Sequence, residues 1–173
     1  MGLDYGRTMQ IRPCTTEDLE RVRAIYAEHV RAGTGSFEEV PPESSEIERR
    51  FVAVTSRGFP FYVGELAGSV AGFAYAGPYH TRSAYRFTCE DSVYVEPAAQ
   101  RRGLGRALLS AVIDGAARLG QKQMVALVGD AENAGSIALH RALGFRRAGA
   151  LTAVGLKHGR WLDVVLMQRA LGA

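Results

Sequence analysis

The chain has 173 residues, of which 47% are hydrophobic, and this predicts one domain with enough apolar material for a packed core. The formal net charge is +3, and because the Lys and Arg residues are scattered rather than massed on one predicted element, we expect no nucleic-acid partner. Two cysteines are too few for a disulfide framework, and there is no N-terminal apolar segment and no run of about 18 apolar residues, so we expect a cytoplasmic protein without a membrane partner.

The apolar pattern changes between strand and helix periods along the chain. Residues 1–8 look like a loose N-terminal extension, and a single domain is expected over residues 9–171. A strand at 10–12 leads to Thr15, which can cap a helix that Gly33 ends. The further predicted elements, in chain order, are a helix at 45–55, a hairpin of strands at 61–65 and 70–76, a strand at 87–95, a helix at 103–119, a strand at 123–128, a helix at 133–143, and closing strands at 148–154 and 161–168.

The segment Gln100–Gly105 is the most informative in the chain, because it follows a predicted strand and opens a predicted helix. Its two glycines let the backbone approach a ligand closely, and free N–H groups at a helix N-terminus favour a pyrophosphate. The same glycines also fit an ordinary strand-to-helix turn. A nucleotide-triphosphate loop is disfavoured because no Gly-Lys-Ser/Thr follows, and a dinucleotide site because Leu108 replaces a third glycine and the next strand ends in Gly129.

Gln100, Gly103 and Gly105 stand at the defining positions of a Gln/Arg-x-x-Gly-x-Gly signature, so the chain resembles the GCN5-related N-acetyltransferases (GNAT). The resemblance implies acetyl-CoA as co-substrate. It also implies the GNAT fold of the α/β (α+β) class, a mixed, mostly antiparallel sheet of about seven strands with about four helices. In that fold, strands four and five splay apart to hold acetyl-CoA.

Four short strings narrow the resemblance to the phosphinothricin N-acetyltransferase branch. They occur in order at Ala74–Pro78, Arg82–Tyr85, Glu90–Val95 and Leu156–Asp163. The branch implies acetylation of the α-amino group of a glutamate-like amino acid, such as phosphinothricin, methionine sulfoximine or methionine sulfone, by direct attack in a ternary complex. It also implies a homodimer, to which the apolar C-terminal strand could contribute. His80 stands where lysine is common in the branch, which favours methionine sulfone or sulfoximine over the more anionic phosphinothricin.

The chemistry needs a base, because an amine with a pKa near or above about 8 is mostly protonated at neutral pH. Glu90 matches the family's catalytic glutamate, and burial or a relaying water would make it a competent base; the alternative is a surface carboxylate. Cys89 points to the opposite face of the strand and is expected in the core. His140 lies where relatives carry an acid for the departing thiolate, although it could instead simply pack beside Leu139 and Leu143.

The resemblance assigns further residues to binding. A backbone N–H near 93–95 would stabilise the oxyanion, and Asn133 would cap its helix and bond the pantetheine region. The full set of cofactor contacts that it implies is Val93, Tyr94, Val95, Gln100, Arg101, Arg102, Gly103, Leu104, Gly105, Arg106, Asn133 and Ser136. For the amino acid, Arg82 offers a bidentate fork, Tyr85 a hydroxyl and Phe37 an apolar wall.

Several residues carry no expected role. His29 is predicted on an exposed helix flank and Trp161 beneath the last strand. No His, Cys or carboxylate cluster has metal-ligand spacing, so we expect no metal. Two alternative functions stay open. The first is acetylation of another amine, such as a polyamine, an aminoglycoside or a protein N-terminus, and the second is an acyl-CoA sensor without turnover.

Overall fold

The computed structural model describes residues 9–172, so the expected extension at residues 1–8 lies outside the described part. The helices are α1 (Leu19–Ala32), α2 (Ser44–Thr55), α3 (Leu104–Arg118) and α4 (Ala134–Ala142). The strands are β1 (Met9–Pro13), β2 (Phe61–Leu66), β3 (Ser69–Pro78), β4 (Thr88–Val95), β5 (Gln123–Gly129), β6 (Arg146–Lys157) and β7 (Arg160–Ala170). Short 3₁₀ turns lie at Thr16–Asp18, Ser83–Tyr85 and Pro97–Ala99.

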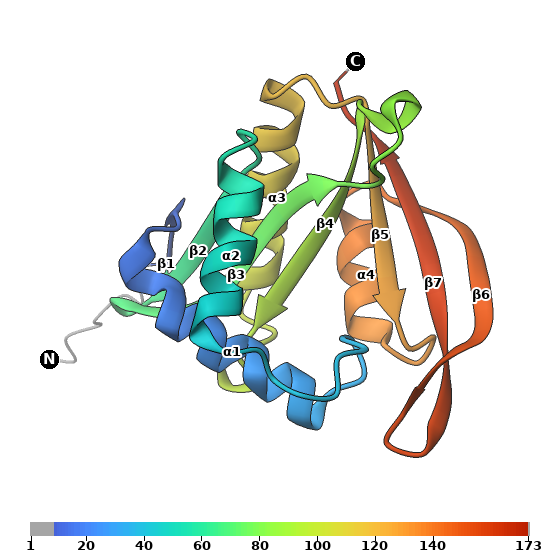
Figure 1. The fold of residues 1–173 in the computed structure, drawn as a ribbon, viewed down its shortest axis with the longest axis horizontal. Helices are drawn as coiled ribbons and strands as arrows, with labels where there is room; N and C mark the ends of the chain where they lie inside the picture. Colours follow the sequence, from blue (N-terminus) through green and yellow to red (C-terminus); the bar gives the residue numbers. More distant parts are fainter. Residues whose placement is uncertain (1–8, 173) are drawn as a thin grey trace, which may run out of the picture.

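The strands form one sheet in the order β1-β2-β3-β4-β5-β7-β6 (Figure 1). Of its neighbouring strand pairs in residues 9–172, β4 and β5 alone run parallel. The mixed, mostly antiparallel sheet of seven strands with four α-helices, which the resemblance implied, is confirmed for the described part.

Helices cover both faces of the sheet. On one face Tyr94 of β4 contacts Tyr26 and His29 of α1, with ring centroids 5.0 and 5.4 Å apart. On the other face α3 buries an apolar side that includes Leu104 and Leu108. Side chains alternate between the two faces along a strand, so the even-numbered residues of β4 face α1 and the odd-numbered ones face α3 and α4. Among the described residues, no helix has the length and apolarity needed to cross a membrane.

The parallel pair is short, and this opens the sheet. Thr88–Glu90 of β4 pair with Gln123–Val125 of β5, and beyond Glu90 the two strands are no longer paired. Figure 1 shows them diverging from this point, with α4 behind the opening. The splay that the resemblance implied is therefore present.

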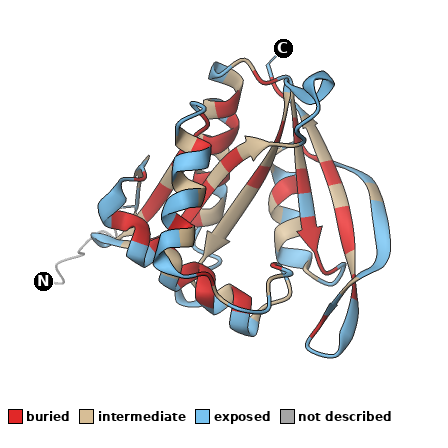
Figure 2. Ribbon diagram, in the orientation of Figure 1, coloured by how far each residue is buried: buried red, intermediate tan, exposed pale blue. Residues whose placement is uncertain are grey.

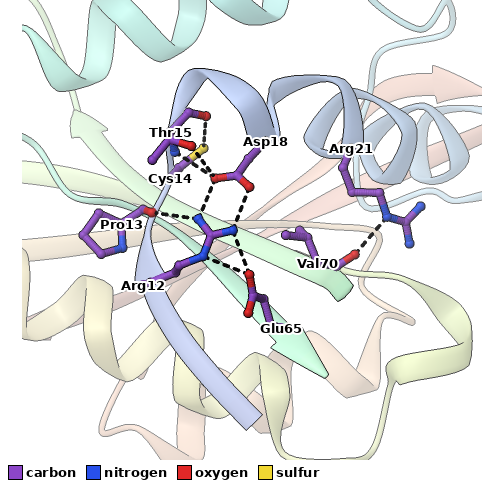
Figure 3. A network of polar contacts seen from close by, with 8 residues as sticks. All are labelled: Arg12, Pro13, Cys14, Thr15, Asp18, Arg21, Glu65 and Val70. Atoms are coloured by element: carbon purple, nitrogen blue, oxygen red, sulfur yellow. Dashed lines mark hydrogen bonds and ion pairs between the residues drawn. The ribbon is translucent and has the colours of Figure 1, made fainter. Parts of the chain in front are cut away.

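At the far edge of the sheet, Arg12 ties β1 to the start of α1 and to β2 (Figure 3). Its Nη1 and Nη2 donate to the two carboxylate oxygens of Asp18 at 2.7 and 2.8 Å, and its Nε donates to Glu65 Oε1 at 2.9 Å. The hydrogen bonds from Arg12 lower the pKa of Asp18. Asp18 also accepts from the Thr15 N–H at 2.8 Å, so Thr15 and Asp18 together begin the helical segment, as the sequence predicted for Thr15.

The C-terminal hairpin differs from the prediction. Both strands are longer than expected, because β6 continues through two register shifts against β7 to Lys157 rather than ending at Val154. Ala153, with φ +51°, lies within the second irregularity. Trp161 does not pack beneath the last strand: it is 66% exposed, beside Leu156 on the strand opposite. Figure 2 shows most of β6 exposed as well.

Candidate active site

The loop before α3 has the backbone that its glycines require. Gly103 has φ +87° and precedes the first helical residue, and Arg101 also has a positive φ, +60°. A Cβ at Gly105 would meet Leu139 at 3.5 Å and Val95 at 3.6 Å, which are ordinary contacts, so the protein's own packing does not demand a glycine there. Gly105 leaves space for a ligand beside the helix N-terminus, where free N–H groups favour a phosphate.

This loop forms one end of a cavity of about 970 Å³ that passes between the diverging parts of β4 and β5. That volume lies at the upper end for small-molecule sites. Of the residues predicted to bind the cofactor, the cavity is lined by Val93, Tyr94, Val95, Gln100, Arg101, Gly103, Gly105, Arg106, Asn133 and Ser136.

Two residues of the predicted cofactor set do not line this cavity. Leu104 is 1% exposed and packs in the core, so only its backbone N–H is available to a ligand. Arg102 borders a separate small hollow beside Leu66 and Glu96. The sequence motif could not distinguish these two from their neighbours, because the direction of each side chain depends on how the loop enters α3.

His29 was expected to be ordinary, and the structure corrects this. It is half-buried, lines the cavity, and its Nε2 donates to the backbone oxygen of Val95 at 2.9 Å. Gln100 Nε2 donates to the same oxygen at 3.2 Å. These two hydrogen bonds hold the end of β4 close to the start of the segment at residues 100–105, the glycine loop. The sequence gives little indication of the His29–Val95 contact, because it joins residues 66 positions apart.

Helix α4 forms the opposite wall of the cavity. Asn133 Oδ1 accepts from the Ser136 N–H at 3.2 Å, so Asn133 caps α4 as predicted. Because this cap already occupies Asn133 Oδ1, its amide nitrogen is the group left for a ligand.

Glu90 is half-buried on the cavity wall and shares the face of β4 that Tyr94 presents to α1. Burial, and then the nearby charge of Asp91, raise its pKa to about 7. A carboxyl group with that pKa can accept a proton near neutral pH far better than an ordinary glutamate. Cys89, as expected, is fully buried, and burial raises the pKa of its thiol to about 12, which does not suit a nucleophile.

His140 faces the cavity from α4 but is only 3% exposed, and both of its ring nitrogens have partners. Nδ1 lies 2.8 Å from the Ser136 backbone oxygen, and Nε2 lies 3.0 Å from Asp91 Oδ2. Burial alone would lower the pKa of His140, but the Asp91 carboxylate and the Ser136 carbonyl outweigh it, so the pKa is raised. Asp91 was not predicted as a site residue, although strand alternation places it on the α4 side.

The end of the cavity beside Glu90 is closed by the segment between α1 and α2. Phe37 lies against Gly155, where an added Cβ would overlap its ring. Lys157 is 2% exposed and donates from Nζ to the Ser36 backbone oxygen at 2.6 Å. Phe37 lines the cavity, and its role as an apolar wall for the amino acid stays a prediction.

A second carboxylate stands at this end. Glu38 lines the cavity, and its Oε1 accepts from Tyr26 Oη at 2.9 Å and from Arg50 Nη1 at 2.7 Å. The Arg50 guanidinium lies 5.8 Å from the centre of the Tyr26 ring. These two hydrogen bonds hold Glu38 in place, and its Oε2 has no hydrogen-bond partner within residues 9–172.

Arg82 and Tyr85 do not line this cavity. They lie in the segment between β3 and β4, where the Arg82 N–H donates to His80 Nδ1 at 3.2 Å and the Tyr85 ring is 40% exposed. The structure therefore brings Phe37, but not Arg82 or Tyr85, together with Glu90. No group of three potential metal ligands occurs within residues 9–172.

Comparison with known proteins agrees with this geometry. Residues 22–145 match the acetyltransferase (GNAT) family. A phosphinothricin N-acetyltransferase from Alcaligenes faecalis is 50% identical over 100% of this chain and 88% of its own length. An L-methionine sulfoximine/L-methionine sulfone acetyltransferase from Salmonella typhimurium is 47% identical over 94% of this chain and 95% of its own. A solved GNAT superfamily phosphinothricin acetyltransferase from Sinorhizobium meliloti, in complex with AcCoA, superposes with a TM-score of 0.92 at 45% identity, over 95% of this chain and 89% of that one.

Proposed function

Since the chain belongs to the acetyltransferase (GNAT) family and is an acetyl-CoA-dependent N-acetyltransferase, we propose that it acetylates the α-amino group of a glutamate-like amino acid. The acceptors proposed are phosphinothricin, methionine sulfoximine and methionine sulfone; acting on the first would give resistance to that herbicide. The names of the similar proteins support this choice. The observation that carries it is Glu90, a carboxyl group with a raised pKa on the wall of the cavity that the glycine loop closes at its other end.

The cavity suits acetyl-CoA, which supplies the acetyl thioester. The N–H groups at the start of α3 would hold its pyrophosphate, with the charges of Arg101 and Arg106 beside them. The unpaired edge of β4 over residues 93–95 offers backbone groups to the pantetheine arm, opposite Asn133 and Ser136 of α4.

In the reaction, Glu90 accepts a proton from the acceptor ammonium, because only the neutral amine can attack the thioester. A backbone N–H in the segment 93–95 stabilises the oxyanion, an interaction worth about 10²–10³ in rate. His140 assists the departing thiolate from the α4 side. A thiol with a pKa near about 8.5 leaves tolerably without help, so the loss of Glu90 costs more than the loss of His140.

Recognition of the amino acid involves both its ammonium group and its anionic groups. Glu38 and Glu90 attract the ammonium, and Phe37 contacts the side chain. Arg82 is proposed as the partner of the acceptor's anionic groups, with Tyr85 as a further donor. This requires the segment between β3 and β4 to reach the acceptor, since neither residue lines the cavity in the described structure.

One observation favours a different acceptor. Apart from its histidines, the described residues that line the cavity include two cations, Arg101 in the glycine loop and Arg106 in the first turn of α3. Glu38 and Glu90 line the opposite end, where the acceptor would bind. A polycationic acceptor, such as a polyamine, would suit that pair of carboxylates.

A side-by-side assay of thiol release from acetyl-CoA separates the two candidates. The purified enzyme is offered methionine sulfoximine, methionine sulfone, phosphinothricin, glutamate, spermidine and an aminoglycoside. Saturable release with the first three alone supports the amino-acid proposal. Release with spermidine and none with the amino acids replaces it with the polyamine acceptor.

We also propose a homodimer and a cytoplasmic location. The exposed apolar residues Leu151, Val154, Leu156 and Trp161 gather on the β6–β7 hairpin, where β6 forms an edge of the sheet. A second copy packed there would bury this surface. The two cysteines are buried and unpaired, as is common in a reducing compartment.

A further inference from the structure

Asp91 and Glu90 are consecutive residues of β4 with opposite surroundings. Glu90 shares the face of Tyr94, toward α1, whereas Asp91 meets His140 on the α4 side. Both line the same cavity, which passes between the strands. The thioester therefore reaches the acceptor with one carboxylate on each side of β4.

The partners of His140 determine where its protons are. The Ser136 backbone oxygen can only accept, so Nδ1 carries a hydrogen. An ionised Asp91 can also only accept, so Nε2 carries a hydrogen as well. In that form the imidazole has no lone pair with which to take a proton, and it can act only as an acid or as a cation.

Asp91 depends on His140 in turn. Its side chain is 1% exposed, one of its oxygens receives the His140 hydrogen, and the other, Oδ1, is buried without a hydrogen-bond partner among the described residues. An ionised carboxylate in such a place needs a paired positive charge. The two side chains thus stabilise each other in their charged forms.

We propose that Asp91 is a positioning residue that keeps His140 doubly protonated on the α4 side of β4, so that the cationic imidazole stabilises the departing CoA thiolate while Glu90 takes a proton from the amine on the opposite side. This rests on the proposed function. The N–C bond forms, the C–S bond breaks, and the sulfur leaves with the electron pair. The ammonium gives up two protons in all, the first to Glu90 and the second to solvent, and the thiolate takes one from solvent. The Asp91–His140 pair keeps its protons throughout, and one proton is released for each turnover.

The pH profile of kcat distinguishes this role from a merely structural one. The titratable groups around Asp91 in the described part are Cys89 and Glu90 on β4 and His140 on α4. Asp91→Asn removes a charge that raises the pKa of both Glu90 and His140. Both limbs of the profile should therefore move to lower pH. At pH 8 kcat should fall about tenfold, which is less than the roughly 10²-fold low end for general acid–base catalysis, because a thiol leaves readily.

Asp114→Asn is the matched control, because Asp114 is exposed on α3 and does not line the cavity. It should leave the profile unchanged. A uniform loss of kcat in Asp91→Asn, with both limbs where the unmodified enzyme has them, would reduce Asp91 to a structural residue and overturn the proposal.

The ¹⁵N NMR signals of the imidazole provide a readout that needs no acceptor. His140 in the unmodified protein should keep two protonated nitrogens to a higher pH than in Asp91→Asn, with assignment from the loss of the signals in His140→Gln. If His140 titrates identically in both proteins, Asp91 does not hold its proton. If no amine is acetylated while the titration differs as expected, the proposed function fails and the Asp91–His140 pairing stands without its catalytic step.

Discussion

Glu90 illustrates how function opposes stability at the level of one residue. Its folded pKa, about 7, is above the value of about 4.5 that it has in an unfolded chain. Between these two pH values the folded protein holds a proton that the unfolded chain has released, so the free energy of unfolding falls as the pH rises. The site that makes Glu90 a base therefore destabilises the protein at neutral and alkaline pH.

Glu90→Gln should consequently raise the melting temperature at pH 8, because the amide cannot ionise. The gain should be at most about 3 kcal/mol, and it should shrink as the pH falls from 7 toward 4.5, where glutamate is protonated in both states. Differential scanning calorimetry of both proteins across this range measures it. A melting difference that does not vary with pH would mean that burial does not perturb Glu90.

Among individual residues, the sequence predicted the proposed catalytic residues better than the residues that position the site through hydrogen bonds. Glu90 and His140 were identified through a family pattern, and both line the cavity. Asp91 and His29 were missed because their contacts join positions 49 and 66 apart in the chain, and residue type alone does not indicate such pairs. Arg82 was chosen for its chemistry, but its position depends on the segment between β3 and β4, which no periodic pattern describes.

At the scale of elements, the segment between α1 and α2 is fixed against β6 and against the loop that follows β5. Thr34 Oγ1 donates to Asp130 Oδ2 at 2.6 Å, and Lys157 donates to the Ser36 oxygen. Phe37 fills the space above Gly155. These contacts set the shape of the acceptor end of the cavity without involving the glycine loop.

Gly155→Ala should therefore affect the acceptor alone. The added methyl group overlaps the Phe37 ring, so Phe37 must move and KM for the acceptor should rise about tenfold, whereas the affinity for acetyl-CoA should stay the same. Steady-state kinetics and calorimetric titration with acetyl-CoA give the two values. Gly149→Ala, on the same strand but in open space, is the control and should behave as the unmodified enzyme does.

The order of the elements followed from the sequence, but several of their ends did not. Three of the four helices, α2, α3 and α4, were placed within one residue of their actual bounds, whereas α1 begins at Leu19, after a 3₁₀ turn over Thr16–Asp18. The predicted end of β6 at Val154 was wrong, because pairing with β7 continues through the register shifts to Lys157. Pairing between distant strands, rather than local preference, decides where such a strand ends.

At the scale of the whole molecule, the β6–β7 hairpin carries the exposed apolar surface that we assign to a second copy. If the protein is a dimer through this surface, Trp161→Glu should give a monomer, because a charge cannot be buried there without a partner. Sedimentation velocity gives the mass.

Val52→Glu is the control, since Val52 is 52% exposed on α2, away from the hairpin. A dimer that survives Trp161→Glu, or an unmodified protein that sediments as a monomer, would remove the hairpin from the interface.

The most direct test of the account is turnover of methionine sulfone by the unmodified enzyme and by Glu90→Gln across pH 6 to 9. The unmodified enzyme should show a rising limb with a midpoint near pH 7, set by the raised pKa of Glu90. Glu90→Gln should lose that limb and at least about 100-fold in turnover, with acetyl-CoA binding retained. Turnover that is unchanged in Glu90→Gln at every pH would contradict the assignment of Glu90 as the base.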